Sequence, residues 1–200
     1  MIKIGLTGNF GCGKSTALKM FQARGVAVLD ADDLARDAVA PGQPAYRRIV
    51  RRFGPDILRP DGAINRAGLA AIVFADKVHR EALGAIVHPP VRRKIRDFLK
   101  ACHSARKALC VVCIPLLYET GLEGWFDAVA VVKASQSASI ARAGKSHGMS
   151  RSQTLGRLRA QMPLREKCRR ADFVLDNGGS VLHLRRQVEG LLKKLKSHEA

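Results

Sequence analysis

The chain has 200 residues and a formal net charge of +18, with 46% hydrophobic and 26% charged residues. This length and mixture suit one globular domain with room for an inserted subdomain, and no apolar run is long enough to cross a membrane. The basic residues are spread along the chain and aromatic residues make up only 5%, so a solvated basic surface is favoured over a nucleic-acid interface.

In the first part of the chain, apolar strands alternate with helices. The predicted elements are a strand at 2–7, a helix at 14–24, a strand at 26–30 and a helix from about 32 to 39. Asp32 or Asp33 is expected to cap the last of these helices.

The strand pattern stops between about residues 44 and 104. The helices predicted there are 46–53, 65–74, 76–87 and 91–101. Pro89 and Pro90 follow His88 and are expected to divide the last two, because proline interrupts helical hydrogen bonding. Residues 41–104 are therefore predicted to form a helical insertion.

Strands and helices alternate again after residue 104. The predicted elements are strands at 108–114, 128–133 and 173–175 and helices at 137–145, 151–160 and 181–196, with Pro163 opening a further short helix. The whole pattern predicts a single α/β domain over residues 1–200, with a five-stranded parallel sheet covered by helices on both faces. Its ligand site is expected at the carboxyl ends of the strands.

Residues 8–15 read G-N-F-G-C-G-K-S and match the phosphate-loop pattern at every fixed position. Glycines allow successive backbone N–H groups to point at an anion, and the following helix adds its positive end. Lys14 is expected to reach the β- and γ-phosphates of ATP, Ser15 to ligate Mg²⁺, and Thr16 to lie near the α-phosphate. The residues predicted to contact the nucleotide here are Gly11, Cys12, Gly13, Lys14, Ser15 and Thr16.

The five cysteines are odd in number and irregularly spaced, which favours a reducing compartment over a disulfide framework. Cys110 and Cys113 should point to opposite faces of a buried strand and fill the core. Cys12 is either a small residue tolerated in the loop, which we favour, or a thiol whose pKa is lowered by the helix end. The N-terminus lacks the layout of a secretory signal, so we expect a cytoplasmic protein.

A phosphate loop alone does not decide the class of protein. The chain has no Asn-Lys string, so the guanine-binding element of a GTPase is missing, and it is short for a large mechanical ATPase. A compact kinase fits better. Asp32 follows the second strand beside the loop, where it could accept a proton from an attacking hydroxyl or hold Mg²⁺, or could simply cap a helix.

A series of short motifs continues along almost the entire chain. They are I-G-L-T-G with G-K-S-T (4–8, 13–16), D-A-D-x-x-A-R (30–36), P-G (41–42), F-G (53–54), D-G (61–62), I-V-F-A-D (72–76), H-P (88–89), P-L-L-Y-E (115–119), A-Q-M-P (160–163), E-K (166–167) and A-D-F-V-L-D-N-G-G (171–179). In this order the motifs resemble the dephospho-coenzyme A kinase family.

The resemblance implies a P-loop kinase that transfers the γ-phosphoryl group of ATP to the ribose 3′-hydroxyl of dephospho-CoA, the last step of coenzyme A synthesis. It implies catalytic roles for Lys14, Asp32 and Arg142, and Mg²⁺ binding by Ser15 and Asp32. The acceptor-pocket residues that it implies are Asp32, Arg36, His88, Pro115, Leu116 and Leu117, and the adenine-pocket residues are Asn177 and Gly178.

The resemblance also divides the chain by role. Residues 1–40 and 105–200 correspond to the nucleotide-binding core, 41–104 to the acceptor-binding insertion, and 137–171 to a lid. Within that lid, Arg142 and the segment 157–161 would lie over the phosphates, where mobile arginines supply charge and exclude water.

Three positions depart from the family pattern. Asn9 replaces a glycine, but asparagine tolerates a positive φ well. Cys113 stands where a carboxylate is common, and Ser146 stands where the lid has a second arginine, with Lys145 beside it. Lysine gives a point charge without the arginine fork. These changes leave nucleotide binding intact and put the catalytic rate in question.

Two other functions stay open. One is a kinase of the same build with another hydroxyl or a nucleotide as acceptor. The other is an RNA-binding protein that uses its +18 charge and has a vestigial nucleotide site, although Lys14, Ser15 and Asp32 are intact. The expected partners are small molecules, with no membrane, and the sequence does not determine the oligomeric state.

Overall fold

The computed structural model describes residues 1–197, apart from the side chains of residues 74, 147, 196 and 197. Its strands are β1 (Ile2–Thr7), β2 (Ala27–Asp30), β3 (Leu109–Cys113), β4 (Ala128–Lys133) and β5 (Phe173–Asp176). Its helices are α1 (Lys14–Gln22), α2 (Ala31–Ala38), α3 (Pro44–Phe53), α4 (Arg66–Ala75), α5 (Lys77–Ser104), α6 (Gln136–His147), α7 (Arg151–Arg159), α8 (Leu164–Arg170) and α9 (Val181–Ser197), with 3₁₀ turns η1 (Pro55–Ile57) and η2 (Glu123–Trp125).

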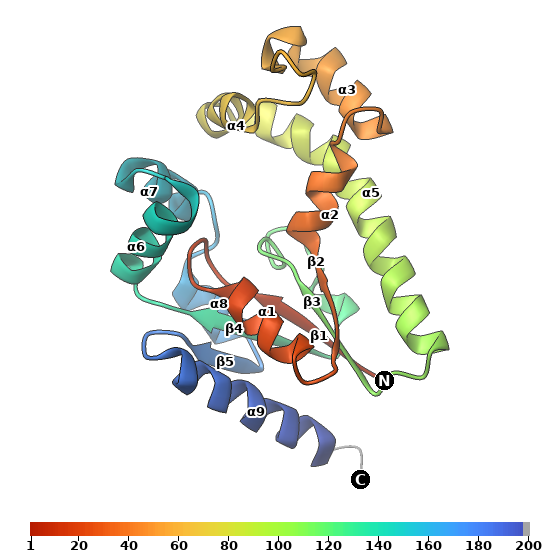
Figure 1. The fold of residues 1–200 in the computed structure, drawn as a ribbon, viewed down its shortest axis with the longest axis vertical. Helices are drawn as coiled ribbons and strands as arrows, with labels where there is room; N and C mark the ends of the chain where they lie inside the picture. Colours follow the sequence, from red (N-terminus) through yellow and green to blue (C-terminus); the bar gives the residue numbers. More distant parts are fainter. Residues whose placement is uncertain (198–200) are drawn as a thin grey trace. The chain divides into compact units, whose positions relative to one another are not determined.

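The five strands form one parallel sheet in the order β2-β3-β1-β4-β5 (Figure 1). This confirms the predicted five-stranded α/β fold. β1 is the central strand, and it leads directly into the glycine-rich loop. Because all the strands run the same way, the segments that follow β1, β3, β4 and β5 gather at one edge of the sheet.

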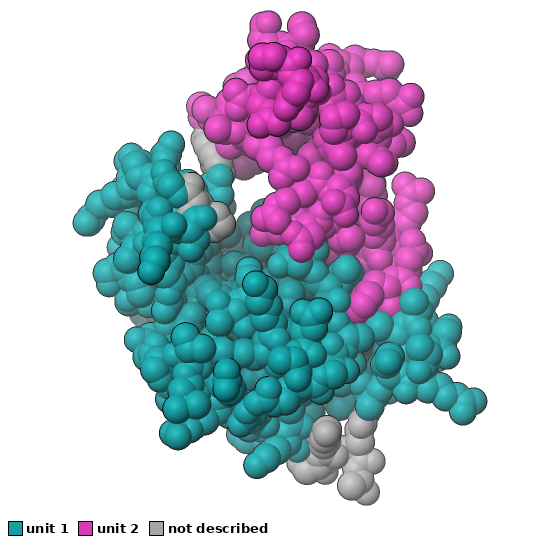
Figure 2. All heavy atoms as spheres, viewed as in Figure 1, with its two compact units in different colours: residues 1–30, 99–200 teal, residues 31–98 magenta. Residues whose placement is uncertain are grey.

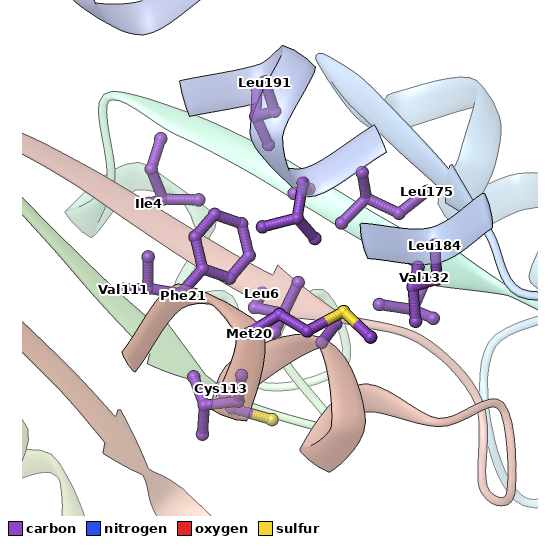
Figure 3. Close-up of a cluster of buried hydrophobic side chains, with 14 of the residues drawn as sticks. Ile4, Leu6, Met20, Phe21, Val111, Cys113, Val132, Leu175, Leu184 and Leu191 are labelled. Carbon is purple, nitrogen blue, oxygen red and sulfur yellow. The ribbon is translucent and has the colours of Figure 1, made fainter. Parts of the chain in front are cut away.

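The two faces of β1 have different neighbours. Ile4 and Leu6 point into a buried cluster with Phe21 of α1 and with Leu184 and Leu191 of α9, as Figure 3 shows. Between them, Gly5 faces the other way, where a side chain would collide with Leu117 and Phe126. Burying a large aliphatic side chain stabilises a fold by about 1.5–3 kcal/mol, so this cluster fixes α1, and with it the end of the loop, on the sheet.

The chain divides into two compact units, which Figure 2 shows in different colours. Unit 1 contains Met1–Asp30 and Leu99–Ala200, and includes the whole sheet; unit 2 contains Ala31–Phe98. Unit 2 is helical apart from a short bridge between Leu58 and Ile64. It has a small core of its own, made of Ala45, Ile49, Ile57, Ile64, Leu69, Val73 and Ile86.

The predicted break at Pro89 and Pro90 is wrong, because both prolines lie inside the single helix α5. A proline inside a helix costs about 3 kcal/mol. Ile86 and Ile95 are buried on either side of the prolines. Burial of these flanking side chains offsets the cost, which a local sequence pattern does not show.

The other differences are at element ends. α2 begins at Ala31, so Asp32 and Asp33 lie in its first turn and neither is its cap, contrary to expectation. Carboxylates there still favour the helix, because they face its positive end. In the described part of the chain, no helix combines the length and the apolar character that a bilayer span requires.

Candidate active site

The glycine-rich loop after β1 is shaped by backbone conformations that only glycine adopts easily. Gly8, Gly11 and Gly13 have φ values of 144°, 73° and 95°. A Cβ atom on Gly8 would lie 2.3 Å from the Val132 carbonyl oxygen, and one on Gly13 would lie 2.1 Å from Asn177 Nδ2. Both the backbone and the neighbouring atoms therefore require glycine at these two positions.

α1 begins at Lys14, directly after Gly13, and no side chain caps it. The first N–H groups of a helix lack partners within the helix, so this end is suited to an anion. The Lys14 ammonium donates to the Asn9 carbonyl at 3.1 Å, which keeps it over the loop. Ser15 and Thr16 are exposed in the first helical turn. The loop thus presents one ammonium and two hydroxyl groups beside a helix end.

Cys12 is fully buried beneath the loop. Burial raises the pKa of its thiol, against the opposing charge of Lys14. The possibility of a lowered pKa is therefore wrong, and Cys12 is the small, inert residue that we favoured. Its carbonyl oxygen matters more, because it accepts hydrogen bonds from Asn177 Nδ2 at 2.8 Å and from Arg142 Nη1 at 3.4 Å.

Arg142 on α6 and Asn177 after β5 also bind each other. Arg142 Nη2 donates to the Asn177 carbonyl at 2.8 Å, and the Asn177 N–H donates to the Lys133 carbonyl. Asn177 is only 6% exposed. The structure thus brings three predicted site residues together, since a single arginine fork holds the loop at Cys12 and the β5 end at Asn177.

The connector between α7 and α8 (residues 160–163) contacts the first half of the loop. Gln161 Oε1 accepts from the Phe10 N–H at 2.8 Å, and the Met162 carbonyl accepts from Asn9 Nδ2 at 3.4 Å. The Arg157 guanidinium lies 4.8 Å from the centre of the Phe10 ring. The loop is therefore held by α6 at its second half and by the connector at its first half.

The Pro115–Leu117 segment follows β3 at the same edge of the sheet. The Pro115 carbonyl accepts from Thr7 Oγ1, the last residue before the loop, at 3.2 Å. Leu117 is fully buried against the sheet, whereas Leu116 is 37% exposed. Of the two leucines, only Leu116 is exposed to solvent.

Gly178 follows Asn177 in unit 1 and is exposed, and the last three predicted residues lie on unit 2. Asp32 is exposed in the first turn of α2. On the same helix, Arg36 pairs with Asp33 at 2.6 Å. His88 lies back over Gly84 on α5 and is half-buried, and burial lowers its pKa, with a smaller contribution from Arg92. These three side chains are carried on helix surfaces.

Among the His, Cys, Asp and Glu side chains that the structure describes over residues 1–197, which leave out His147, no three form a cluster that could hold a metal ion. Cys110 and Cys113 are buried as predicted, with Cys113 in the core shared with α1 and α9, and all five cysteines are free thiols. A Mg²⁺ ion held by one hydroxyl group and by phosphate oxygens needs no such cluster.

A family model of dephospho-CoA kinases matches residues 2–183 of the chain. The chain belongs to the dephospho-CoA kinase family. It is 43% identical over 193 residues to a dephospho-CoA kinase of Geobacillus kaustophilus, and the match covers 96% of each chain.

Solved structures agree with this family. The fold is similar to that of the protein TT1252 from Thermus thermophilus, with a TM-score of 0.80, 38% identity and 97% of each chain covered. It is also similar to a dephospho-CoA kinase from Campylobacter jejuni, with a TM-score of 0.71, 25% identity and coverage of 99% of this chain and 98% of that one. The resemblance predicted from the motifs is confirmed.

The three departures from the family pattern have distinct structural settings. Asn9 does not have a positive φ, because Arg106 is the only non-glycine residue with a positive φ among the residues that the structure describes. Its side chain instead reaches the connector. Cys113 is buried in the core, and Ser146 is exposed near the end of α6 beside Lys145.

Sequence reasoning assigned no role to Lys167 and Glu119, although each lies in a family motif. Lys167 on α8 is fully buried and donates to the Pro115 carbonyl, and it pairs with Glu119. A lysine in a short, basic helix predicts a solvated charge, so only the tertiary structure reveals this pair. The motif positions themselves, E-K and P-L-L-Y-E, were the available signal.

Proposed function

We propose that this protein catalyses phosphorylation of the ribose 3′-hydroxyl group of dephospho-CoA by ATP, giving coenzyme A and ADP. The observation that carries the proposal is the match to the dephospho-CoA kinase family over residues 2–183, together with an intact phosphate loop. We place this reaction in the cytoplasm. The five free thiols are consistent with such a reducing compartment.

The loop binds the phosphates of ATP. Its glycines turn the backbone towards the anion, and Lys14 moves from the Asn9 carbonyl to the β- and γ-phosphates. The exposed hydroxyl group of Ser15, next to Lys14, suits Mg²⁺, which neutralises phosphate charge when it is bound. Phosphoryl transfer depends mainly on such neutralisation and alignment.

From the first turn of α2, Asp32 accepts the proton of the attacking hydroxyl group or would help Ser15 to hold Mg²⁺. The acceptor dephospho-CoA binds to Arg36, His88 and the Pro115–Leu117 segment. Leu116 contacts it directly, while Leu117 supports the segment from the core. We assign acceptor binding to the helical segment of residues 41–104 and a lid role to residues 137–171.

Arg142 and Asn177 have a more specific role than the one expected from the resemblance. The Asn177 side chain is committed to the Cys12 carbonyl and is nearly buried, so it supports the adenine pocket and does not read the base. Exposed Gly178 is left to face the adenine. Arg142 supplies positive charge beside the loop. The two hydrogen bonds of its guanidinium, to the Cys12 and Asn177 carbonyls, hold that charge in place between the loop and the end of β5.

The test is incubation of purified protein with Mg-ATP and dephospho-CoA, followed by mass spectrometry. A product heavier by one phosphate is expected, along with ADP. A 3′-deoxy analogue of dephospho-CoA should stay unmodified, which identifies the hydroxyl group that reacts. AMP and a sugar alcohol, offered in parallel, test for another acceptor, and faster turnover of either would contradict the proposed substrate.

A further inference from the structure

Lys167 is a buried charge that the mechanism above does not use. Its side chain is 0% exposed, whereas that of its partner Glu119 is 20% exposed. Its Nζ atom lies 2.9 Å from the Pro115 carbonyl oxygen and 2.9 Å from Glu119 Oε1. Burial lowers the pKa of Lys167, and Glu119 opposes that shift. Burying an ammonium group costs free energy, which its hydrogen bonds to Pro115 and Glu119 must offset.

The first partner leads to the start of the loop. The Pro115 carbonyl accepts from Lys167 and also from Thr7 Oγ1, at 3.2 Å. Thr7 is the last residue of β1, and Gly8 follows it. One carbonyl oxygen thus joins α8, the segment after β3 and the residue that begins the loop.

The second partner leads to the same loop by another path. The oxygen of Glu119 that binds Lys167 also accepts the Met162 N–H at 2.8 Å. The Met162 carbonyl accepts a hydrogen bond from Asn9 Nδ2, and the Asn9 carbonyl accepts one from the Lys14 ammonium. Two chains of hydrogen bonds therefore run from one ammonium group to residues on either side of Gly8.

A second ion pair on α8 provides a contrast. Arg169 and Glu166 are also 2.9 Å apart, but their side chains are 77% and 35% exposed. Exposed pairs contribute little to stability, and in the described structure the side chains of this pair hydrogen-bond only to each other. Burial and a link to the loop distinguish Lys167 from its neighbours on the same helix.

We propose that Lys167 is a positioning residue for phosphoryl transfer. It fixes the Pro115 segment directly and, through Glu119, fixes the connector of residues 160–163 against the first half of the phosphate loop. This inference rests on the proposed function. Without Lys167 the loop still binds phosphate, but its amides and Lys14 must be ordered at the moment of transfer, so the chemical step slows more than binding weakens.

The experiment compares Lys167→Met with wild-type protein in the dephospho-CoA assay. We expect kcat to fall by about tenfold to a hundredfold, with a smaller change in the KM for ATP. Hydrogen exchange should increase at residues 7–13 and 160–163, with α9 unchanged. Arg169→Met is the control on the same helix and should keep wild-type kcat and wild-type exchange.

Two further variants keep the test decisive if Lys167→Met folds poorly. Glu119→Gln keeps the oxygen that accepts from Met162, and the double variant Lys167→Met with Glu119→Gln removes both charges. If Lys167 acts through Glu119, the double variant should lose no more kcat than Lys167→Met alone. Thermal unfolding is measured for every variant, and kcat is compared only between folded proteins.

The outcomes separate the two proposals. If wild-type protein does not phosphorylate dephospho-CoA, the proposed function fails, and exchange of the loop still reports on Lys167. If wild-type protein is active and a folded Lys167→Met or double variant keeps kcat within about twofold, the positioning role is wrong. A loss of kcat without faster exchange in the loop would overturn it as well.

Discussion

The candidate residues of unit 1 and those of unit 2 are held in different ways. In unit 1, Arg142 and Asn177 reach the Cys12 carbonyl across more than a hundred residues of sequence, and Asn177 is nearly buried. In unit 2, Asp32 and Arg36 are exposed on one short helix, and Arg36 pairs with Asp33 only three residues away. The residues that we propose for the nucleotide are therefore held by long-range hydrogen bonds within unit 1, whereas Asp32 and Arg36, which we propose for the acceptor, are exposed on a helix surface of unit 2.

This difference suits a two-substrate reaction. Preorganised charge around a polyphosphate stabilises the transition state without reordering during the reaction. Exposed groups on helices adapt more easily to a large acceptor, at the cost of ordering them on binding. Substitutions in unit 1 should thus affect the chemical step most, and those in unit 2 should affect chemistry through Asp32 alone.

The largest effect is expected for Lys14→Met in the phosphate loop. It removes the ammonium group that we propose for the transferred phosphate, and we expect kcat to fall by about a thousandfold. Lys19→Met, in the last turn of the same helix, is the matched control and should be nearly neutral. Near-normal turnover by the Lys14 variant would show that the loop is not the catalytic phosphate site.

Asp32→Asn tests the proposed role of the exposed carboxylate in unit 2. We expect a loss of about a hundredfold in kcat, with Mg-ATP affinity little changed, because the variant removes a proton acceptor and leaves the loop intact. Asp33→Asn, one residue later and paired with Arg36, should keep most activity. Equal losses in both variants would indicate that the helix, and not one carboxylate, is what matters.

Much of unit 1 could be predicted from the sequence because its signals are local. The loop pattern and the apolar strands both depend on residues close together in the chain. The failures are of the opposite kind. Pro89 and Pro90 remain helical because of burial on both sides, and Lys167 is buried because of partners about fifty residues away.

The settings of Asn9 and Cys12 illustrate the same limit within the loop itself. The sequence places both residues in the phosphate loop, but it does not show what surrounds them. Asn9 turns its side chain to the connector, and Cys12 is buried beneath the loop, where its pKa is raised. Tertiary neighbours decide both outcomes.

A smaller effect should follow from Gln161→Ala in the connector. The Phe10 N–H would lose its acceptor, which lies at 2.8 Å, and we expect the free energy of unfolding to fall by about 1–2 kcal/mol. Urea unfolding measures the change. Gln161→Glu retains an oxygen acceptor and should recover most of it, and Gln136→Ala, exposed at the start of α6, should have no effect. If Gln161→Ala is as stable as wild type, the connector does not hold the loop.

The smallest effect expected is on the pH dependence of the unfolding free energy, through Cys110 in β3. Burial, with a contribution from neighbouring Cys102, raises the pKa of Cys110 from 9.0 to about 12. An unfolded thiol ionises near 9.0 and the folded one does not, so this contribution to stability is full below 9.0 and is lost as the pH rises towards 12. Between about pH 8 and about pH 10, Cys110→Ala should lose less unfolding free energy than wild type. Parallel losses in both proteins would contradict this origin.

Calorimetric titration of Mg-ATP into the folded protein tests most directly whether the loop at residues 8–15 binds a nucleotide triphosphate. The account predicts a saturable heat for one site per chain, strongly reduced in Lys14→Met and retained in Asp32→Asn. Wild-type protein that is folded by circular dichroism but releases or absorbs no heat with Mg-ATP would contradict it.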